Sequence, residues 1–334
     1  MMEFLINYGM FLAKLGTVVL LFLALFIVAF ILYMRARAGA EEHLEVKNLN
    51  QKYEQMQLML KSAILPKKDF KKTMKDVKAR HKKESKIDTP DAGRKRVFVL
   101  DFNGDIRASE VASLREEISA LLTVAGKDDE VFVRLESAGG TVHGYGLAAS
   151  QLQRIKDHGI ALTISVDKIA ASGGYMMACV ANQIIAAPFA ILGSIGVLTQ
   201  LPNFNRFLKK HDIDFEQFTA GKYKRTVSLF GENTEEDREK LQQELEEAHT
   251  LFKEFIKHNR DKVDIDKVST GEHWYGKQAL DMGLVDQLST SDEYLSRAVP
   301  SADIYEITYI RKRPFLERLM NPVAKFFLPE PYTD

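Results

Sequence analysis

Cysteine is nearly absent from this chain, and its scarcity excludes two kinds of architecture. A single cysteine, Cys179, occurs among 334 residues. One thiol cannot close an intrachain disulfide, so neither a disulfide-stapled scaffold nor a zinc site built on cysteine pairs is available. The eight histidines show no HExxH or comparable ligand spacing. The sequence therefore predicts no metal site and no other cofactor.

The chain also has no net charge. The 46 lysines and arginines balance 46 aspartates and glutamates, which argues against a dedicated nucleic-acid binder. Low-complexity tracts and solenoid periods are absent as well. With 46% hydrophobic residues, the chain is long enough for one large domain plus extra segments, but not clearly for two full domains.

Residues 15–34, LGTVVLLFLALFIVAFILYM, carry no charge at all. Such a run is long enough to cross a hydrocarbon core of about 30 Å as a helix. A cleaved signal peptide is the alternative, because Ala36, Ala38 and Ala40 offer a small-residue cleavage pattern. Signal sequences, however, have apolar regions of only about 7–15 residues and a basic start, which is nearly missing here. The pattern favours an uncleaved anchor.

Basic residues gather after this run. Lys14 alone precedes it, whereas Arg35 and Arg37 follow directly and lysines are dense from 61 to 86. The positive-inside rule places the bulk of the chain in the cytoplasm, although the rule weakens before a long domain. Residues 67–86 hold few large apolar side chains and are predicted to be a solvated linker. The alternative is attraction to anionic lipid headgroups beside the anchor.

Alternating strands and helices follow a boundary at DTPDAG (88–93). Apolar and β-branched runs predict strands, and apolar residues at helical spacing predict helices. We expect strands at 96–102, 130–137 and 161–170, and helices at 35–60, 108–125, 141–159 and, after a capping box at Thr234 and Asp237, 235–260. This alternation of predicted strands and helices is typical of an α/β fold built from strand–turn–helix units.

Two of the predicted strand-to-helix turns are rich in glycine: ESAGG (136–140) and ASGG (171–174). Ser172 in the second turn fits two roles. It is either a helix N-cap, which is the common use of such a serine, or a nucleophile beside glycine amides that donate to an oxyanion. The first turn is either a tight turn or an anion-binding turn. If the two turns face each other, they would form one site.

Four segments, ESAGGTVHGYG, ASGGYMMACVAN, GSIGV and TAGKYKRT, occur in an order and spacing that resemble the S49 peptidase family. LDFNGDIRASEVASLREEISALL and the anchored basic N-terminus are similar to the SohB branch of that family. The resemblance covers about residues 1–300. It implies stacked ββα units, as in the Clp protease and crotonase superfamily, preceded by one transmembrane helix in a bacterial inner membrane.

The resemblance also implies a Ser/Lys dyad. Ser172 matches the nucleophile, Lys224 the general base, Ser194 the serine that orients the lysine amine, and Gly173 with Gly140 or Gly139 the oxyanion-hole donors. The first turn departs from the family pattern, since ESAGG replaces the common Asn-Ser-Pro-Gly-Gly. The loss of proline changes turn stiffness but keeps the amide donors.

Physical chemistry sets a condition on Lys224. A lysine with an ordinary pKa near ~10.4 is a poor base at neutral pH; burial without a carboxylate lowers that pKa by up to ~3–5 units. Without the resemblance, Lys224 beside Lys222 and Arg225 would be interpreted as a solvent-exposed side chain. A Ser-His-Asp triad is the rival, but His211, the first histidine after Ser172, lies in a charged stretch.

These patterns predict an N-terminal segment (1–14), an anchor (15–34), a basic helical or linker region (35–94), a peptidase domain (95–300) and a tail (301–334). The resemblance implies a membrane-anchored serine endopeptidase that degrades signal-peptide remnants or unfolded membrane-derived peptides. It further implies a ring-shaped homo-oligomer in which Lys224 of one subunit serves Ser172 of its neighbour.

A catalytically silent scaffold and a crotonase-like acyl-CoA enzyme are the alternatives. The tail would dock on a neighbouring subunit or lie at the membrane surface.

Overall fold

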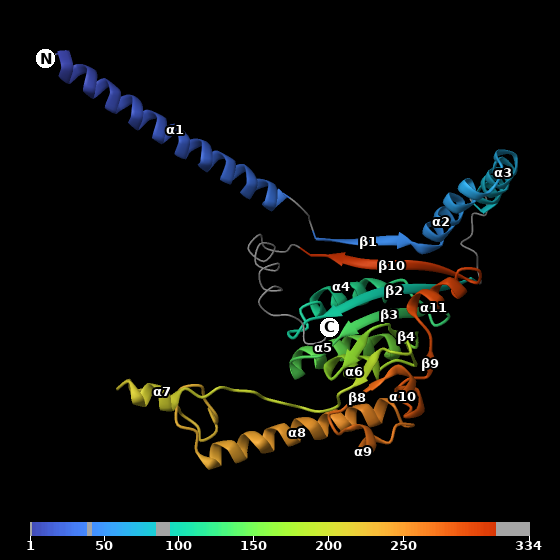
Figure 1. Ribbon diagram of the computed structural model, residues 1–334. Helices are drawn as coiled ribbons and strands as arrows, with labels where there is room; N and C mark the ends of the chain where they lie inside the picture. Colours follow the sequence, from blue (N-terminus) through green and yellow to red (C-terminus); the bar gives the residue numbers. More distant parts are fainter. Residues whose placement is uncertain (1, 39–41, 85–93, 312–334) are drawn as a thin grey trace. The chain divides into compact units, whose positions relative to one another are not determined.

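The computed structural model describes residues 2–38, 42–84 and 94–311 (Figure 1). The chain forms two compact units, one of residues 1–45 and 309–334 and the other of residues 46–308. The cleavage-site alanine Ala40, the DTPDAG boundary and all of the tail after residue 311 lie outside the described residues.

The described residues of the first unit include one long helix, α1 (Met2–Ala38). Its segment Tyr8–Ile31 is long and apolar enough to cross a membrane, and none of the side chains in its most apolar window is buried. Most of the uncharged run 15–34 lies in this segment. A helix that exposes apolar side chains all around suits a lipid environment rather than a water-filled one.

Most of the second unit is organised around a sheet whose main path has the order β1-β10-β2-β3-β4-β6-β9, with the first residues of β1 and the last of β10 outside the bounds of that unit. The pairings from β10 through β9 are parallel. The strands on this path are β1 (His43–Asn48), β2 (Lys95–Gly104), β3 (Glu130–Ser137), β4 (Ala161–Val166), β6 (Gln183–Ala186), β9 (Gln287–Leu288) and β10 (Ala302–Ile310). Thus the first described part of the predicted tail is a strand, paired with β2 from Ala302 onward.

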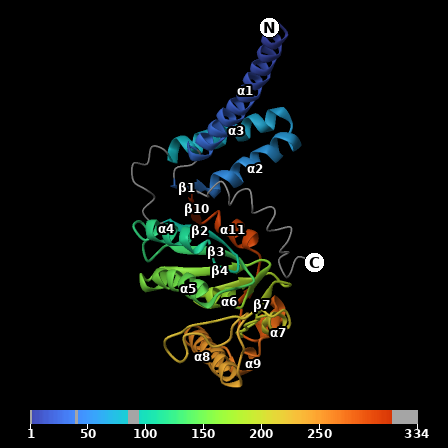
Figure 2. The same cartoon turned by 90° about the vertical axis from the view of Figure 1, so that its left-hand side faces the viewer.

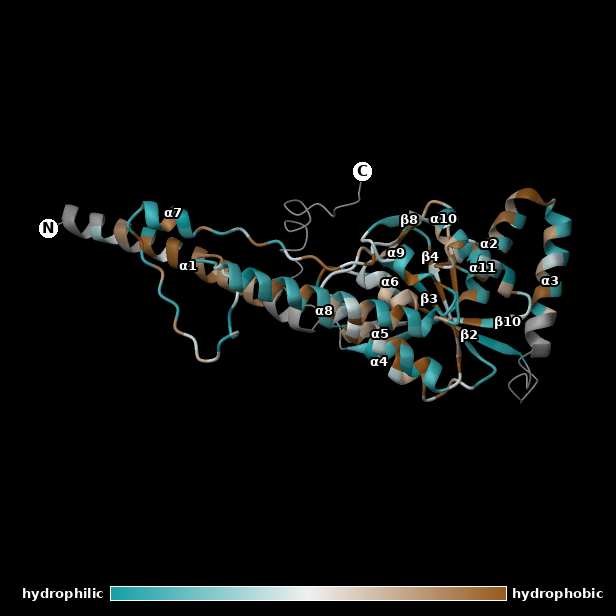
Figure 3. Cartoon of the chain, turned by 90° about the horizontal axis from the view of Figure 1, so that it is seen from below, coloured by the Kyte–Doolittle hydropathy of each residue, from teal (hydrophilic) through white to brown (hydrophobic). Residues whose placement is uncertain are grey.

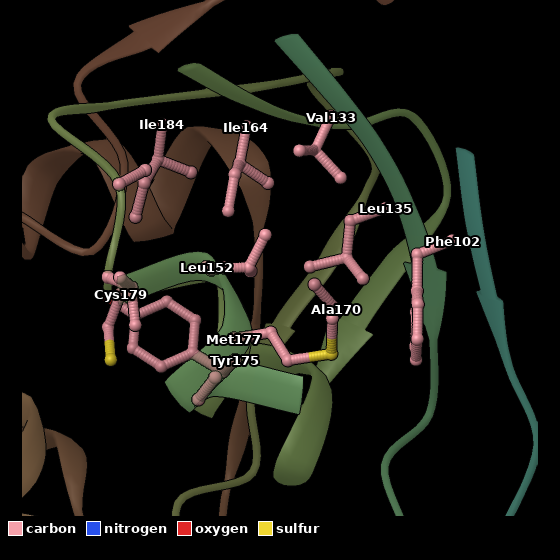
Figure 4. Packing of buried hydrophobic residues seen from close by; sticks show 14 of the residues in the cluster. Phe102, Val133, Leu135, Leu152, Ile164, Ala170, Tyr175, Met177, Cys179 and Ile184 are labelled. Carbon is pink, nitrogen blue, oxygen red and sulfur yellow. The ribbon is translucent and has the colours of Figure 1, made fainter. Parts of the chain in front are cut away.

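Both faces of the sheet are covered, as the near-continuous apolar strands of a parallel sheet require. On β2, Phe98, Leu100 and Phe102 belong to the larger core, while Val97 and Val99 belong to the smaller one. The larger core is completed chiefly by α4 (Val111–Leu121), α5 (Val142–Asp157) and α6 (Gly173–Ala178), and Figure 4 shows its packing. The smaller core includes residues of α11 (Ser291–Ala298) and the start of α2 (Leu49–Ile64).

The predicted α/β class and its strand–turn–helix units are confirmed. Strand 130–137 has the predicted bounds, and the expected strand 161–170 is two strands, β4 and β5 (Ile169–Ala171). The split occurs because β4 pairs with β6, whereas β5 leaves the main path to pair with β7 (Ile191–Gly193). Strand β8 (His273–Tyr275) then pairs antiparallel with β7.

Two predictions for the region before residue 95 were wrong. The helix expected at 35–60 is interrupted, because residues 43–48 form β1 before α2 begins. The linker expected at 67–86 is instead helix α3 (Lys67–Glu84) over its described residues. Phe70, Met74 and Val77 recur at helical spacing and are half-buried, and α3 contacts α2. This narrow apolar face, combined with good helix formers such as lysine, explains the helix.

The remaining helices follow β7. They are α7 (Asn205–Lys210), α8 (Glu235–Asn259), α9 (Ile265–Val268) and α10 (Gly276–Asp281). Helix α8 begins with the predicted capping box. The Asp237 amide donates to the Thr234 hydroxyl at 3.2 Å, and the Thr234 amide donates to the Asp237 carboxylate. Only its C-terminal half reaches the core, through Phe252 and Ile256. Figures 1 and 3 show α7 and the start of α8 extending away from the sheet.

Candidate active site

Ser172 lies at a sharp turn between β5 and α6. Its backbone has φ 51° and ψ −119°, a conformation that L residues rarely adopt, and its side chain makes no capping hydrogen bond. The Ser172 amide donates to the Gly193 carbonyl at 2.7 Å, which ties the turn to β7. A strained turn of this kind, which costs about 1–3 kcal/mol, lifts a side chain out of the fold. The structure therefore excludes the helix-cap interpretation of the hydroxyl.

The two glycine turns meet at this point. Gly139 has φ 91°, and a Cβ built there would lie 2.7 Å from the Gly173 nitrogen and 2.8 Å from the Ser172 Cβ. A Cβ on Gly140 would lie 2.0 Å from the Ile106 carbonyl oxygen. Both positions thus require glycine, because backbone approaches too closely for any side chain. The expectation that the turns face each other is confirmed by these contacts.

The backbone amides around the turn differ in whether they already donate a hydrogen bond within the protein. The Gly139 amide donates to the Ser137 hydroxyl at 3.0 Å, so it is committed to the protein. Within residues 94–311, the amides of Gly140 and Gly173 make no hydrogen bond. Of the three predicted oxyanion-hole donors, the geometry therefore leaves Gly140 and Gly173 able to bind an oxyanion, and it assigns Gly139 to shaping the turn.

A buried chain of hydroxyl groups supports the first turn. The Ser137 hydroxyl lies 2.5 Å from the Tyr145 hydroxyl, which donates to the Asp105 carbonyl at 2.7 Å. The Tyr145 ring also fills the space that a Cβ on Gly173 would occupy, with its Cγ 2.4 Å away. Burial raises the pKa of Tyr145 to about 12, so this phenol stays neutral. Sequence reasoning missed Ser137 and Tyr145, whose link depends on the folded turn.

Ser194 is brought next to Ser172 by the sheet register. Ala171 and Gly193 are paired at the ends of the parallel strands β5 and β7, whose spacing is about 4.8 Å, and each serine is the residue that follows its strand. Ser194 also has a positive φ, 49°, and its amide donates to the Glu272 carbonyl at 2.7 Å. The two predicted serines therefore follow neighbouring, paired strand ends.

Among the described residues, Lys224 forms no hydrogen bond or ion pair with the Ser172 turn. It lies in the segment 195–234, called the arm here, which connects β7 to α8 and which contains α7. Figures 1 and 3 show the arm leaving the sheet, with its far end well away from α6. Lys224 is exposed, and among the described residues it has no ion-pair partner, unlike neighbouring Lys222, which pairs with Glu236.

The rival Ser-His-Asp triad is not formed by His211, the first histidine after Ser172. His211 lies on the arm, exposed, with its ring against Phe207 at 4.2 Å between centroids. No group of three or more histidine, cysteine, aspartate or glutamate side chains in the described part of the chain has metal-binding geometry. The groups present at the turn are the Ser172 hydroxyl on a strained backbone and the free amides of Gly140 and Gly173.

Comparison with known proteins gives consistent matches over nearly the whole chain. The model "Peptidase family S49 N-terminal" matches residues 3–152, and "Peptidase family S49" matches residues 154–304. A probable protease SohB of Haemophilus influenzae is 46% identical over 95% of this chain and 92% of its own length. The probable protease SohB of Buchnera aphidicola subsp. Schizaphis graminum is 49% identical over 96% and 94%.

Among solved structures, a lysine-to-alanine mutant of the 1510-N membrane-bound stomatin-specific protease, in complex with a substrate peptide, matches 70% of this chain and 99% of its own. The sequence identity is 14% and the TM-score is 0.43.

Proposed function

Because this chain belongs to peptidase family S49, we propose that it is a membrane-anchored serine endopeptidase with Ser172 as its nucleophile. The observation that carries the proposal is the Ser172 turn, where a strained backbone holds an uncommitted hydroxyl beside the free amides of Gly140 and Gly173. Strained residues persist where the surrounding structure fixes them, and they cluster at active sites. Membership of the S49 family, expected from the sequence, is confirmed by the two matching family models and by the 46% identical relative.

The chemistry proceeds by acyl transfer. The Ser172 oxygen attacks the scissile carbonyl carbon while its proton passes to a neutral lysine amine. The Gly140 and Gly173 amides donate to the oxygen that becomes negative. Collapse breaks the C–N bond, and the protonated lysine gives its proton to the leaving amine. Water then hydrolyses the acyl-enzyme by the same proton route, and the Ser194 hydroxyl orients the amine throughout.

The lysine in this scheme is Lys224 from a neighbouring copy of the chain. The arm that carries it exposes large apolar side chains, including Leu198, Phe207 and Phe218, the last 90% exposed. Exposed apolar patches of this kind mark contact surfaces. Docking on a second copy would bury these side chains and would take Lys224 out of contact with water. A ring-shaped homo-oligomer supplies such a neighbour to every subunit.

The substrates are apolar peptide segments. Ile106 and Val142, which flank the Gly140 turn on either side, are both more than half exposed, and the Thr141 amide between them bonds to the Ile106 carbonyl at 2.9 Å. These side chains offer an apolar surface directly beside the free amides. Signal-peptide remnants and unfolded membrane-derived peptides have the matching composition.

Subunit complementation tests the proposal. The full chain, Ser172→Ala, Lys224→Ala and the control Lys222→Ala are purified with the anchor in detergent and are incubated with fluorogenic apolar peptides. We expect both active-site variants to be inactive and the control to keep its activity, because Lys222 pairs with Glu236 on the same arm. Co-expression of the two inactive variants should restore about a quarter of the wild-type rate, since random mixing completes about one interface in four.

The outcomes separate the alternatives. If the co-expressed mixture stays inactive although both variants assemble, Lys224 does not act across subunits. If Ser172→Ala remains as active as the wild type, Ser172 is not the nucleophile.

A further inference from the structure

The hairpin of α2 and α3 has outer surfaces that the core does not use. The two helices contact each other and are joined through Leu65 and Pro66 (Figures 1 and 2). Leu49, at the start of α2, is the only buried residue of that helix. The hairpin is thus attached to the domain at one end, and most of its length faces outward.

One outward surface is apolar. Met56, Met59, Leu60 and Ile64 are between 52% and 76% exposed. Their spacing of three, four and eight residues from Met56 places them on one face of α2. We call this face the apolar stripe. Four large apolar side chains aligned in water are unfavourable, so the stripe requires a covering surface.

The other outward surface is basic. Between Lys67 and Ala79, α3 carries six exposed lysines against two aspartates, Asp69 and Asp76. None of these lysines forms an ion pair within the described part of the chain. The apolar residues of α3, Phe70, Met74 and Val77, are half-buried instead. The lysines on this surface are Lys67, Lys68, Lys71, Lys72, Lys75 and Lys78.

We propose that the α2–α3 hairpin binds the surface of an anionic lipid bilayer, with the apolar stripe at the acyl-chain boundary and the α3 lysines over the headgroups. An apolar stripe combined with unpaired lysines is the pattern by which interfacial helices bind membranes. Anionic lipid attracts each lysine near its surface. A second protein copy would cover the stripe equally well, but it would have to supply an acidic surface for six unpaired lysines.

Chain connectivity favours the bilayer as the partner. Helix α1 ends at Ala38 and α2 begins at Leu49, and a chain of this length spans at most roughly 40 Å. With α1 in the membrane, as proposed above, the hairpin remains within that reach of the bilayer. Tethering raises the local concentration of the partner surface and makes even a weak contact persistent. The inference uses the anchor but not the catalytic chemistry, so it stands or fails independently of peptidase activity.

A probe on the stripe tests this contact in the full chain. Ile64→Cys provides a thiol for an environment-sensitive fluorophore, while the native Cys179 is fully buried and does not compete. The labelled protein is reconstituted into phosphatidylcholine vesicles, with or without phosphatidylglycerol, that carry a quencher on the acyl chains. Gln242→Cys, on the exposed polar face of α8, is the control label.

We expect quenching at position 64 to increase severalfold when phosphatidylglycerol is present, and to fall again in 1 M salt, where the Debye length is only about 3 Å. The triple variant Lys71→Glu, Lys75→Glu and Lys78→Glu should lose the increase. A matched triple change of exposed lysines elsewhere, at Lys257, Lys267 and Lys277, should retain it.

Three results would overturn the proposal. The first is equal quenching with and without anionic lipid. The second is equal loss in both triple variants, which would show an effect of overall charge alone. The third is a shielded probe at position 64 in detergent, without any bilayer, which would show that another protein copy covers the stripe. A second label at Met59→Cys, on the same face, guards against a local defect at position 64.

Discussion

The backbone at Ser172 makes a prediction that separates function from stability. With φ 51° and ψ −119°, any residue that carries a Cβ is strained there, whereas glycine is not. Ser172→Ala removes the hydroxyl and keeps the strain. Ser172→Gly removes both. The two variants should be equally inactive as peptidases, yet they should differ in stability.

The size of the difference follows from two opposing contributions. Relief of strain stabilises the folded glycine variant by about 1–3 kcal/mol. The greater freedom of glycine in the unfolded chain opposes this by about 0.5–1 kcal/mol. We therefore expect Ser172→Gly to be more stable than Ser172→Ala by about 1 kcal/mol, which corresponds to roughly 2–4 °C in Tm for a domain of this size.

A matched pair of variants at a helical serine gives the control. Ser296 lies exposed within α11, where glycine should be less stable than alanine by about 1 kcal/mol. Thermal and urea unfolding of all four variants, followed by circular dichroism in the same detergent, measure both differences. If the glycine variant is the less stable one at position 172 as well, the turn is not strained and this argument for Ser172 fails.

Three further predictions concern the site support and the core. Tyr145→Phe should lower kcat about tenfold with little change in KM and cost about 1–2 kcal/mol of stability, because it breaks the buried hydroxyl chain beneath the Gly140 turn; Michaelis kinetics and urea unfolding measure the two effects. Arg260→Ala should cost about 3–5 kcal/mol in urea unfolding, because Arg260 is 7% exposed and makes two hydrogen bonds to Asp286. Stability should fall as the pH rises from about 9 toward 12, because burial raises the pKa values of Cys179 and Tyr145 to about 12, so these groups release protons only on unfolding; unfolding across that pH range checks the sign.

Local patterns explain why the candidate turns could be predicted from the sequence. A strand, a small-residue turn and a helix lie within about twenty residues around Ser172, and their apolar periodicity survives without tertiary information. The same is true of strand 130–137 and of the Thr234 cap, since each depends on neighbours in the chain.

The errors arose where tertiary partners decide the structure. The apolar pattern of residues 43–48 is weak. These residues form a strand at the edge of the sheet, next to β10. The dense lysines of α3 obscured three apolar residues at helical spacing, Phe70, Met74 and Val77, which are half-buried in the fold. The sequence does not distinguish the amide of Gly139 from that of Gly140, because the hydrogen bond from the Gly139 amide to the Ser137 hydroxyl forms only in the folded turn. The pairing proposed for Lys224 and Ser172 involves a second chain, which neither one sequence nor one subunit contains.

The most direct test of the account is to identify the residue that forms the covalent intermediate. The full chain, assembled in detergent, is treated with a peptidyl phosphonate that has an apolar side chain, and the adduct is located by mass spectrometry. The account predicts one adduct, on Ser172, that is abolished by Ser172→Ala and strongly slowed by Lys224→Ala but not by Lys222→Ala. An adduct on another residue, or continued peptide hydrolysis by a chain whose Ser172 is unmodified, would contradict it.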